Sequence, residues 1–178
     1  KKMKKNVRYS FWAIFNNKQQ RQLENLKKKI NDEIKGPYFP IHMSLCGELL
    51  EDKRELINKI KKNLSKLNKF SIETNNYGYK NTFFQSLYIK VIKNTKLVSQ
   101  KKIIDNIFNC QTRFFNPHIS LYYGQKHSNL KKKIISNLPN IKKVIKIRNL
   151  CLSCREEKKS KWSKEKKLKW KIVETFRI

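Results

Sequence analysis

One short pattern occurs twice in this chain and constrains its fold more than any other feature. His42–Leu45 reads His-Met-Ser-Leu and His118–Leu121 reads His-Ile-Ser-Leu, and a proline precedes each (Pro40 and Pro117). A given histidine is followed by apolar-Ser-Leu roughly once in a few hundred times on ordinary composition. The chain holds three histidines, so two matches indicate a duplicated structural unit.

Each motif is predicted to be a short β-strand whose alternate side chains face opposite ways. Side chains two residues apart in a strand share a face. His42 and Ser44 should therefore share one face, as should His118 and Ser120. The apolar partners are expected to point into the core, and they are Met43, Leu45, Ile119 and Leu121. If the two strands lie side by side, two imidazoles and two hydroxyls meet on one exposed face.

Such a face suits the opening of a cyclic phosphodiester. The reaction needs one group to activate water and another to protonate the leaving alkoxide, and histidine can do either near neutral pH. The hydroxyls of Ser44 and Ser120 can donate to the non-bridging oxygens, where charge develops. The chemistry needs no metal, and the sequence offers no evident carboxylate cluster to hold one. Base and acid cannot be assigned from the residues themselves.

Patterning along the chain predicts an α+β fold. The strand–helix–strand order occurs twice, once ending at His42 and once leading into His118. Strands are expected at Tyr9–Phe15, Ile41–Leu45, Phe70–Tyr79, Phe83–Ile92, His118–Tyr122, Val144–Ser153 and Lys169–Ile178. Helices are expected at Leu23–Ile34, Leu56–Leu67, Val98–Phe108 and Leu130–Leu138, and an exposed charged loop at Arg155–Lys169.

The paired His-x-Ser motifs resemble the 2H phosphoesterase superfamily, and most of all its plant and yeast type of cyclic nucleotide phosphodiesterase. Tyr9–Trp12, Phe84–Tyr88 and Pro117–Gly124 carry the narrower resemblance, which spans nearly the whole chain. Both motifs have serine where many relatives have threonine, and the hydroxyl is retained.

The resemblance implies one domain, residues 1–178, with two intertwined lobes related by a pseudo-twofold axis, antiparallel sheets lining a central cleft and helices outside. It implies hydrolysis of nucleoside 2′,3′-cyclic phosphates to 2′-phosphates, or of ADP-ribose 1″,2″-cyclic phosphate to the 1″-phosphate, without a cofactor. His42 and His118 would be catalytic, Ser44 and Ser120 would bind phosphate, and analogy makes His42 the base and His118 the acid.

Four neighbouring side chains are weaker candidates for substrate contact. Tyr122 shares a face with Ser120 by alternation, whereas ideal alternation points Tyr123 away unless a bulge near Gly124 reverses it. Phe84 and Gln85 can line the cleft, although a core strand explains them equally well. The third histidine, His127, lies in a polar segment without the motif and is interpreted as a surface residue.

The formal net charge of +30 has two interpretations. Strongly basic proteins attract RNA, nucleotides and other polyanions. Lysine supplies most of the 43 basic residues, however, and Asn and Ile are also abundant, so the charge can equally reflect A/T-rich codons and solvated helix faces. No apolar run approaches the roughly 18 residues of a membrane span, and the N-terminus lacks a signal-peptide cleavage pattern. The expectation is a monomer in the cytoplasm that does not bind membranes.

The cysteines do not form a recognisable disulfide scaffold or zinc site. Cys151 and Cys154 make a lone C-x-x-C, and Cys46 and Cys110 stand apart from it. Four reduced thiols are favoured over a regulatory disulfide.

Two other functions compete with a small-molecule cyclic phosphodiesterase. One is a 2H enzyme that acts on RNA ends or cyclic oligonucleotides, with the basic surface guiding the polymer. The other is a basic RNA-binding protein that has lost catalysis, although two intact His-x-Ser motifs argue against it.

Overall fold

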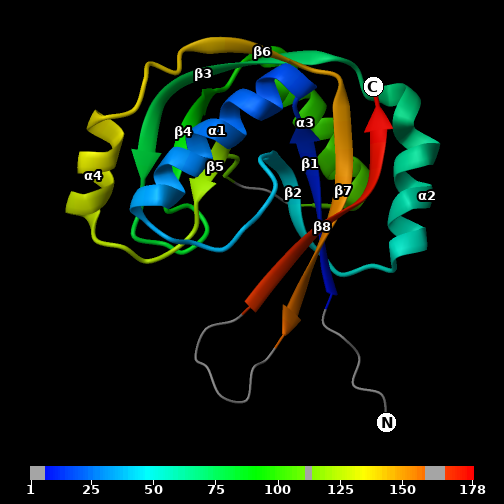
Figure 1. The fold of residues 1–178 in the computed structure, drawn as a ribbon. Helices are drawn as coiled ribbons and strands as arrows, with labels where there is room; N and C mark the ends of the chain where they lie inside the picture. Colours follow the sequence, from blue (N-terminus) through cyan, green and yellow to red (C-terminus); the bar gives the residue numbers. More distant parts are fainter. Residues whose placement is uncertain (1–6, 111–113, 159–166) are drawn as a thin grey trace.

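The fold is taken from a computed structural model that describes residues 7–110, 114–158 and 167–178 (Figure 1). In chain order the elements are β1 (Val7–Ile14), α1 (Asn17–Glu33), β2 (Met43–Leu49), α2 (Lys53–Asn63), the 3₁₀ turn η1 (Leu64–Lys66), β3 (Phe70–Tyr79), β4 (Leu87–Ile92), α3 (Thr95–Phe108), β5 (His118–Tyr122), α4 (Ser128–Ser136), β6 (Lys143–Ile147), β7 (Asn149–Lys158) and β8 (Lys167–Arg177).

The strands form one curled antiparallel sheet in the order β6-β3-β4-β5-β2-β1-β7-β8. The α+β prediction is confirmed, and the two predicted lobes are the four-stranded halves of this continuous sheet. The series β1-α1-β2-α2 in one half is repeated as β4-α3-β5-α4 in the other. The strands that carry the two histidine motifs, β2 and β5, are therefore neighbours at the centre.

The helices cover the central strands and are anchored by polar caps. Helix α1 packs against β5 and α3 against β2, while α2 and α4 lie at opposite sides of the sheet (Figure 1). Asn16 and Asn94 cap the first turns of α1 and α3 by accepting the backbone N–H groups of Gln19 and Leu97, a common helix start. The apolar helix faces and sheet interior form one core, and the predicted inward residues of both motifs are buried in it: Met43, Leu45, Ile119 and Leu121.

The strand predicted at Phe83–Ile92 begins later in the structure. Phe83–Ser86 form a turn, and β4 begins only at Leu87, because Lys80 N–H bonds Ser86 O (3.0 Å) and Gly124 N–H bonds Phe83 O (2.9 Å). These bonds fold the segment away from the ladder with β3.

The strand predicted over Val144–Ser153 is interrupted at Arg148. Its first part, β6, pairs with β3 in one half of the sheet, and its second part, β7, pairs with β1 in the other half. The chain thus crosses from one half to the other, as Figure 1 shows.

The two ends of the charged loop predicted at Arg155–Lys169 belong to strands β7 and β8. The antiparallel pairing of these strands extends to Lys158 and Lys167. The rest of that loop, 159–166, lies outside the described residues.

Among the residues that the structure describes, no helix is long and apolar enough to cross a membrane.

Candidate active site

The two histidine motifs meet at the centre of the sheet. Met43 pairs with Ile119 in the antiparallel ladder between β2 and β5. One residue to either side of this pair, the register places His42 opposite Ser120 and Ser44 opposite His118. Directly opposite side chains in such strands lie about 5 Å apart at Cβ. Each histidine therefore lies across from the serine of the other motif.

Both histidines are held in the same way by their own backbone. His42 Nδ1 is 2.6 Å from the carbonyl oxygen of Pro40, and His118 Nδ1 is 2.8 Å from that of Asn116, two residues earlier in each case. A carbonyl only accepts, so Nδ1 carries the proton in both rings. Nε2 is then the nitrogen left to exchange a proton with a substrate.

His42 lies in a dry aromatic environment. It is 3% exposed, and its ring stacks on Trp12 with centroids 3.5 Å apart and an interplanar angle of 10°. Burial disfavours the imidazolium form and lowers the pKa of His42 to about 3, against the opposing effect of the Pro40 hydrogen bond. The nearby positive charges of His118 and Lys27 lower this pKa further. His42 is therefore neutral at physiological pH.

His118 is less enclosed, although burial also lowers its pKa. The hydrogen bond to Asn116 acts in the opposite direction, and the charge of Lys80 lowers the pKa. The Tyr88 ring meets the His118 ring edge-on at 5.3 Å. The two imidazoles thus differ in environment, as a base and an acid must.

The aromatic partners of the histidines occupy equivalent places in the two halves. Trp12 on β1 pairs in register with Ser44, and Tyr88 on β4 pairs with Ser120. Each motif serine is thus flanked by the aromatic residue that contacts the histidine of its own motif.

The two serines are not equivalent in their surroundings. Ser44 is exposed, whereas Ser120 is buried and its hydroxyl lies 3.4 Å from the Phe84 carbonyl, to which it donates. Ser120 also shares a hydrogen bond with the Tyr123 phenol, a bond that partly opposes the rise of the Tyr123 pKa to about 12 caused by burial. Ser44 is open to solvent on the same face.

Tyr123, not Tyr122, lies on the site face, so the alternation argument for Tyr122 was wrong. Leu87 pairs with Tyr122 but Tyr88 pairs with Ser120, which leaves Leu121 as an extra residue in β5. Such a bulge reverses the faces of the residues that follow. Tyr122 is consequently 2% exposed within the core. A bulge does reverse the faces, but it lies at Leu121 and not near Gly124.

Phe84 and Gln85 are both brought to the site by the turn that replaces the predicted strand. Gln85 Nε2 lies 3.4 Å from His118 Nδ1, and Gln85 Oε1 accepts from Lys80 Nζ at 2.8 Å. The Phe84 ring packs edge-on against Tyr123 with centroids 5.4 Å apart and remains partly exposed.

Sequence reasoning missed two residues contributed by the β7–β8 hairpin. The Trp170 ring lies 6.5 Å from the His42 ring and 6.1 Å from the Tyr123 ring. The Arg155 guanidinium lies over the rings of Phe84 (5.0 Å) and Trp170 (5.5 Å) and pairs with Glu48 at 3.1 Å. Arg155 lies in the predicted charged loop and Trp170 in the predicted last strand, and no local pattern distinguishes either residue from its neighbours.

Cys46 and Cys110 form a disulfide, contrary to the expectation of four reduced thiols. The sequence gives no sign of this pair because the residues are 64 positions apart. They meet because Asn109 ends α3 in a left-handed conformation and turns Cys110 toward β2. Cys151 and Cys154 are both buried and take no part in this disulfide. In the described parts of the chain, the one group of potential metal ligands is Cys46, Cys110 and Asp105, and it includes the disulfide.

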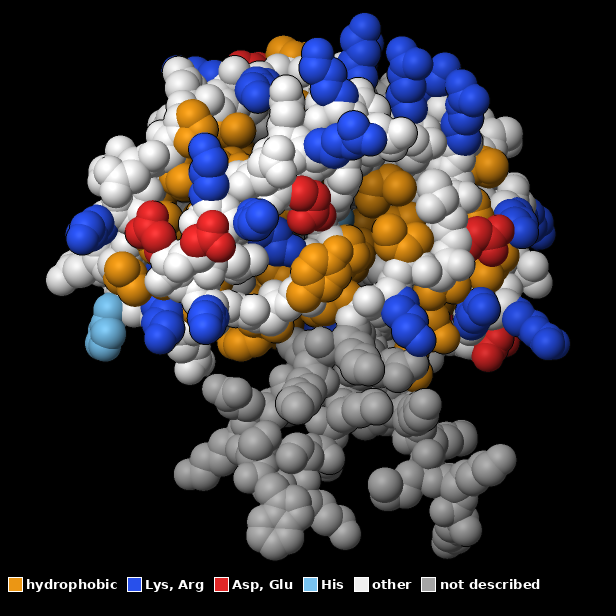
Figure 2. Space-filling model, viewed as in Figure 1, with side chains coloured by type: hydrophobic (Ala, Val, Ile, Leu, Met, Phe, Trp, Pro, Cys, Tyr) orange, Lys and Arg blue, Asp and Glu red, His pale blue; other side chains and the backbone are white. Residues whose placement is uncertain are grey.

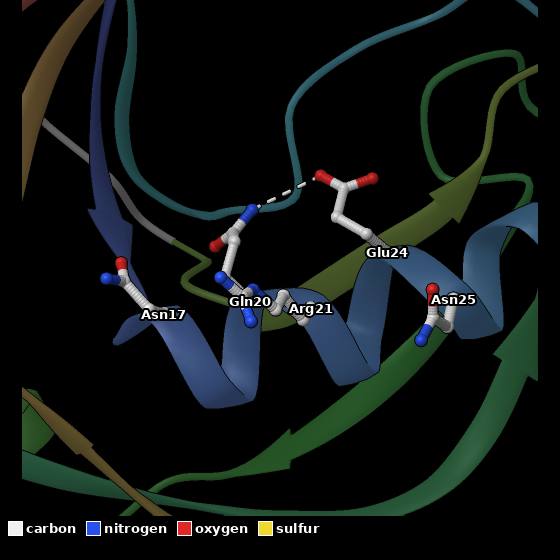
Figure 3. Close-up of a pocket in the computed structure, with 5 residues that line it drawn as sticks. All are labelled: Asn17, Gln20, Arg21, Glu24 and Asn25. Atoms are coloured by element: carbon white, nitrogen blue, oxygen red, sulfur yellow. Dashed lines mark hydrogen bonds between the residues drawn. The ribbon is translucent and has the colours of Figure 1, made fainter.

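An open hollow of about 460 Å³ lies beside α1 (Figure 3). Its lining residues are Asn17, Gln20, Arg21, Glu24 and Asn25.

The third histidine, His127, is exposed directly before α4, as predicted.

The curled sheet with two His-x-Ser strands at its centre fits the class of 2H phosphoesterases, and several solved structures share its fold. A protein described as a phosphoesterase is 12% identical with a TM-score of 0.66, and the match covers 96% of this chain and 98% of that one. Escherichia coli LigT without ligand is 11% identical with a TM-score of 0.64, covering 96% of each chain. The protein TT0787 of Thermus thermophilus is 15% identical with a TM-score of 0.63, covering 96% and 97%.

The family model "Cyclic phosphodiesterase-like protein" matches residues 10–178. The chain belongs to this family, which supports an enzyme that acts on phosphodiesters. None of the curated proteins matches the chain in sequence.

Proposed function

We propose that the protein hydrolyses a cyclic phosphodiester by paired histidine acid–base catalysis, without a metal ion. The observation that carries the proposal is the matched restraint of the two rings. Each Nδ1 proton is bonded to a carbonyl two residues earlier, which leaves both Nε2 atoms for the substrate. The register across β2 and β5 supplies a hydroxyl opposite each ring.

His42 is the base and His118 the acid in the hydrolytic direction. Neutral His42 Nε2 removes a proton from water as the water oxygen attacks phosphorus. The bond from phosphorus to one ring oxygen breaks, and protonated His118 gives its Nε2 proton to that oxygen. The low pKa of His42 supports this order only in that it keeps the ring neutral at physiological pH, with the Nε2 lone pair free. An anionic phosphate next to His118 favours its protonated form.

The substrate is a nucleoside 2′,3′-cyclic phosphate or ADP-ribose 1″,2″-cyclic phosphate, in keeping with the resemblance to the plant and yeast enzymes. Ser44 donates to a non-bridging oxygen, and Ser120 does so when its long hydrogen bond to the Phe84 carbonyl is given up. The rings of Phe84 and Trp170 lie on the flank of the site and offer surfaces on which a base can stack. Membership of the cyclic phosphodiesterase-like family supports this substrate class.

A second candidate is the processing of RNA ends, and the +30 charge favours it. Against it, the basic side chains in Figure 2 are spread over the face shown, with apolar patches between them, and do not form a single stripe. A polymer that contacts several lysines releases counterions, so its kcat/KM should fall steeply with salt, whereas a small substrate should show a shallow dependence.

The deciding experiment offers the full-length protein three substrates in EDTA: 2′,3′-cyclic AMP, ADP-ribose 1″,2″-cyclic phosphate and an RNA with a 2′,3′-cyclic phosphate end. His118→Ala is the inactive variant and His127→Ala, at an exposed histidine, is its matched control. Turnover of the small substrates that is lost only in His118→Ala is the expected result. Turnover of RNA alone would favour the second candidate. RNA binding without any turnover would favour a non-catalytic role, and a rate that needs an added divalent ion would contradict the mechanism.

A further inference from the structure

Two lysines are buried beside the segments that lead into the histidine strands. Lys27 on α1 is 2% exposed and Lys101 on α3 is 4% exposed, although nearly all their lysine neighbours face solvent. A buried ammonium is costly unless polar or aromatic groups surround it. Each of the two must therefore have partners that compensate for its burial.

Lys27 is bound to the residue three positions before His42. Its Nζ donates to the carbonyl of Phe39 and lies 3.9 Å from the centre of the Phe39 ring. The same ring stacks on Tyr123 at 3.8 Å and meets the His42 ring edge-on at 6.2 Å. Lys27 thus fixes a ring that contacts both sides of the candidate site.

Two further side chains of α1 hold the same segment. Glu24 Oε1 accepts the backbone N–H of Ile41 at 3.1 Å, and Gln20 Nε2 donates to the Ile41 carbonyl at 3.2 Å. Gln20 also donates to Glu24 at 3.2 Å, which is the dashed line in Figure 3. Phe39 and Ile41 lie on either side of Pro40, whose carbonyl orients the His42 ring. The acceptor for His42 Nδ1 is therefore held from both sides.

The other half of the sheet repeats the arrangement around Lys101. Its Nζ lies 5.1 Å from the centre of the Phe115 ring, and Phe115 is three residues before His118. The carbonyl that orients His118 belongs to Asn116, the next residue. Lys101 differs from Lys27 in forming an ion pair with Asp105. Helices α1 and α3 occupy equivalent places in the repeat, so the two lysines are counterparts.

A cation–π contact of this kind has a defined geometry. An apolar side chain would fill the same space, so the ammonium is not needed for packing. Compared with an apolar side chain, the ammonium group adds a directed hydrogen bond and a positive charge. The charge of Lys27 reaches His42, because it lowers the pKa of that histidine.

We propose that Lys27 and Lys101 are positioning residues, each of which fixes the aromatic segment that orients one site histidine. The expected effect on the reaction rate rests on the function proposed above. The expected effect on the orientation of the two histidine rings does not depend on that function. It predicts that each lysine acts on the histidine of its own half.

The test compares Lys27→Met with Lys28→Met, and Lys101→Met with Lys102→Met, the controls being exposed lysines one position further along each helix. Methionine keeps most of the apolar chain and removes the charge and the donor. We expect each buried-site variant to lower kcat about tenfold with little change in KM, because a small misplacement of a catalytic group is costly. The controls should match the wild type.

Nitrogen NMR of the histidine rings supplies a readout that does not depend on activity. The Nδ1–H form of His42 should dominate in the wild type and in Lys28→Met, and should lose population in Lys27→Met as the Pro40 carbonyl moves. Lys101→Met should affect His118 alone. If Lys27→Met does not fold, Phe39→Leu, which removes the ring that Lys27 holds, takes its place with the same expected result.

Unchanged ring signals in a folded variant would overturn the proposal, even if its melting temperature fell, because they would show a purely structural role. Altered ring signals in a protein that hydrolyses none of the offered phosphates would leave the positioning role standing and reject the proposed function.

Discussion

Acid should destabilise this protein partly through His42, and the size of the effect follows from its burial. The unfolded chain binds a proton at His42 with its ordinary pKa of 6.5, whereas the folded protein does so only near pH 3. Between these values protonation favours the unfolded chain, so stability present above about pH 6.5 is lost as the pH falls toward 3. Each unit in this window costs about 1.4 kcal/mol. By about pH 4.5 the loss from this one residue is about 3 kcal/mol.

The perturbation is His42→Gln, which removes the titrating group and keeps a polar side chain of similar length. Urea unfolding of both proteins, followed by tryptophan fluorescence at about pH 7 and about pH 4.5, gives the free energies of unfolding. The wild type should lose about 3 kcal/mol more than the variant over this interval. His127→Gln, at an exposed histidine, is the control for loss of an imidazole. Equal losses in the wild type and His42→Gln would refute the argument that His42 is held neutral by burial.

Three further predictions concern the site and the disulfide. Alanine at His42 or His118 should lower kcat by at least about 100-fold in the cyclic phosphodiesterase assay, and the double variant should be little worse than either single one; activity kept by one single variant would remove that residue from the mechanism. Tyr123→Phe should lower kcat about tenfold, since it deletes the partner of the buried motif hydroxyl, while Tyr122→Phe should leave kcat unchanged; the reverse pattern would contradict the bulge in β5. Cys46→Ser should lower the free energy of unfolding by about 2–4 kcal/mol in urea titrations, and dithiothreitol should have the same effect on the wild type but none on the variant.

The sequence predicted the elements that rest on a strong local pattern. The two His-x-Ser strands, their shared face and their burial on the other side follow from alternation alone. The four helices were predicted from their apolar spacing, although α1 begins earlier than its first leucine because Asn16 caps it. That the chain forms one domain and that the protein is a monomer both stay predictions.

The errors came from contacts that join distant parts of the chain. The turn at Phe83–Ser86 depends on a bond from Gly124, and the bulge at Leu121 depends on the register with β4. Neither is visible in a local pattern. Nothing in the sequence separates Lys27 from the many other lysines, because spacing alone does not reveal that its helix face lies against Phe39.

The narrow contact between the motif strands has a consequence for how this protein can diverge. Within the described residues, β2 and β5 share one register pair, whereas the strands inside each half share several. Each half therefore holds its own histidine firmly, and the spacing between the two rings is set at a short seam. We expect substitutions at that seam to adapt the site to a larger or smaller phosphate ester where the packing of α1 on β5 and of α3 on β2 is kept. Relatives with different substrates are then expected to differ more at the seam than in the cores of the two halves.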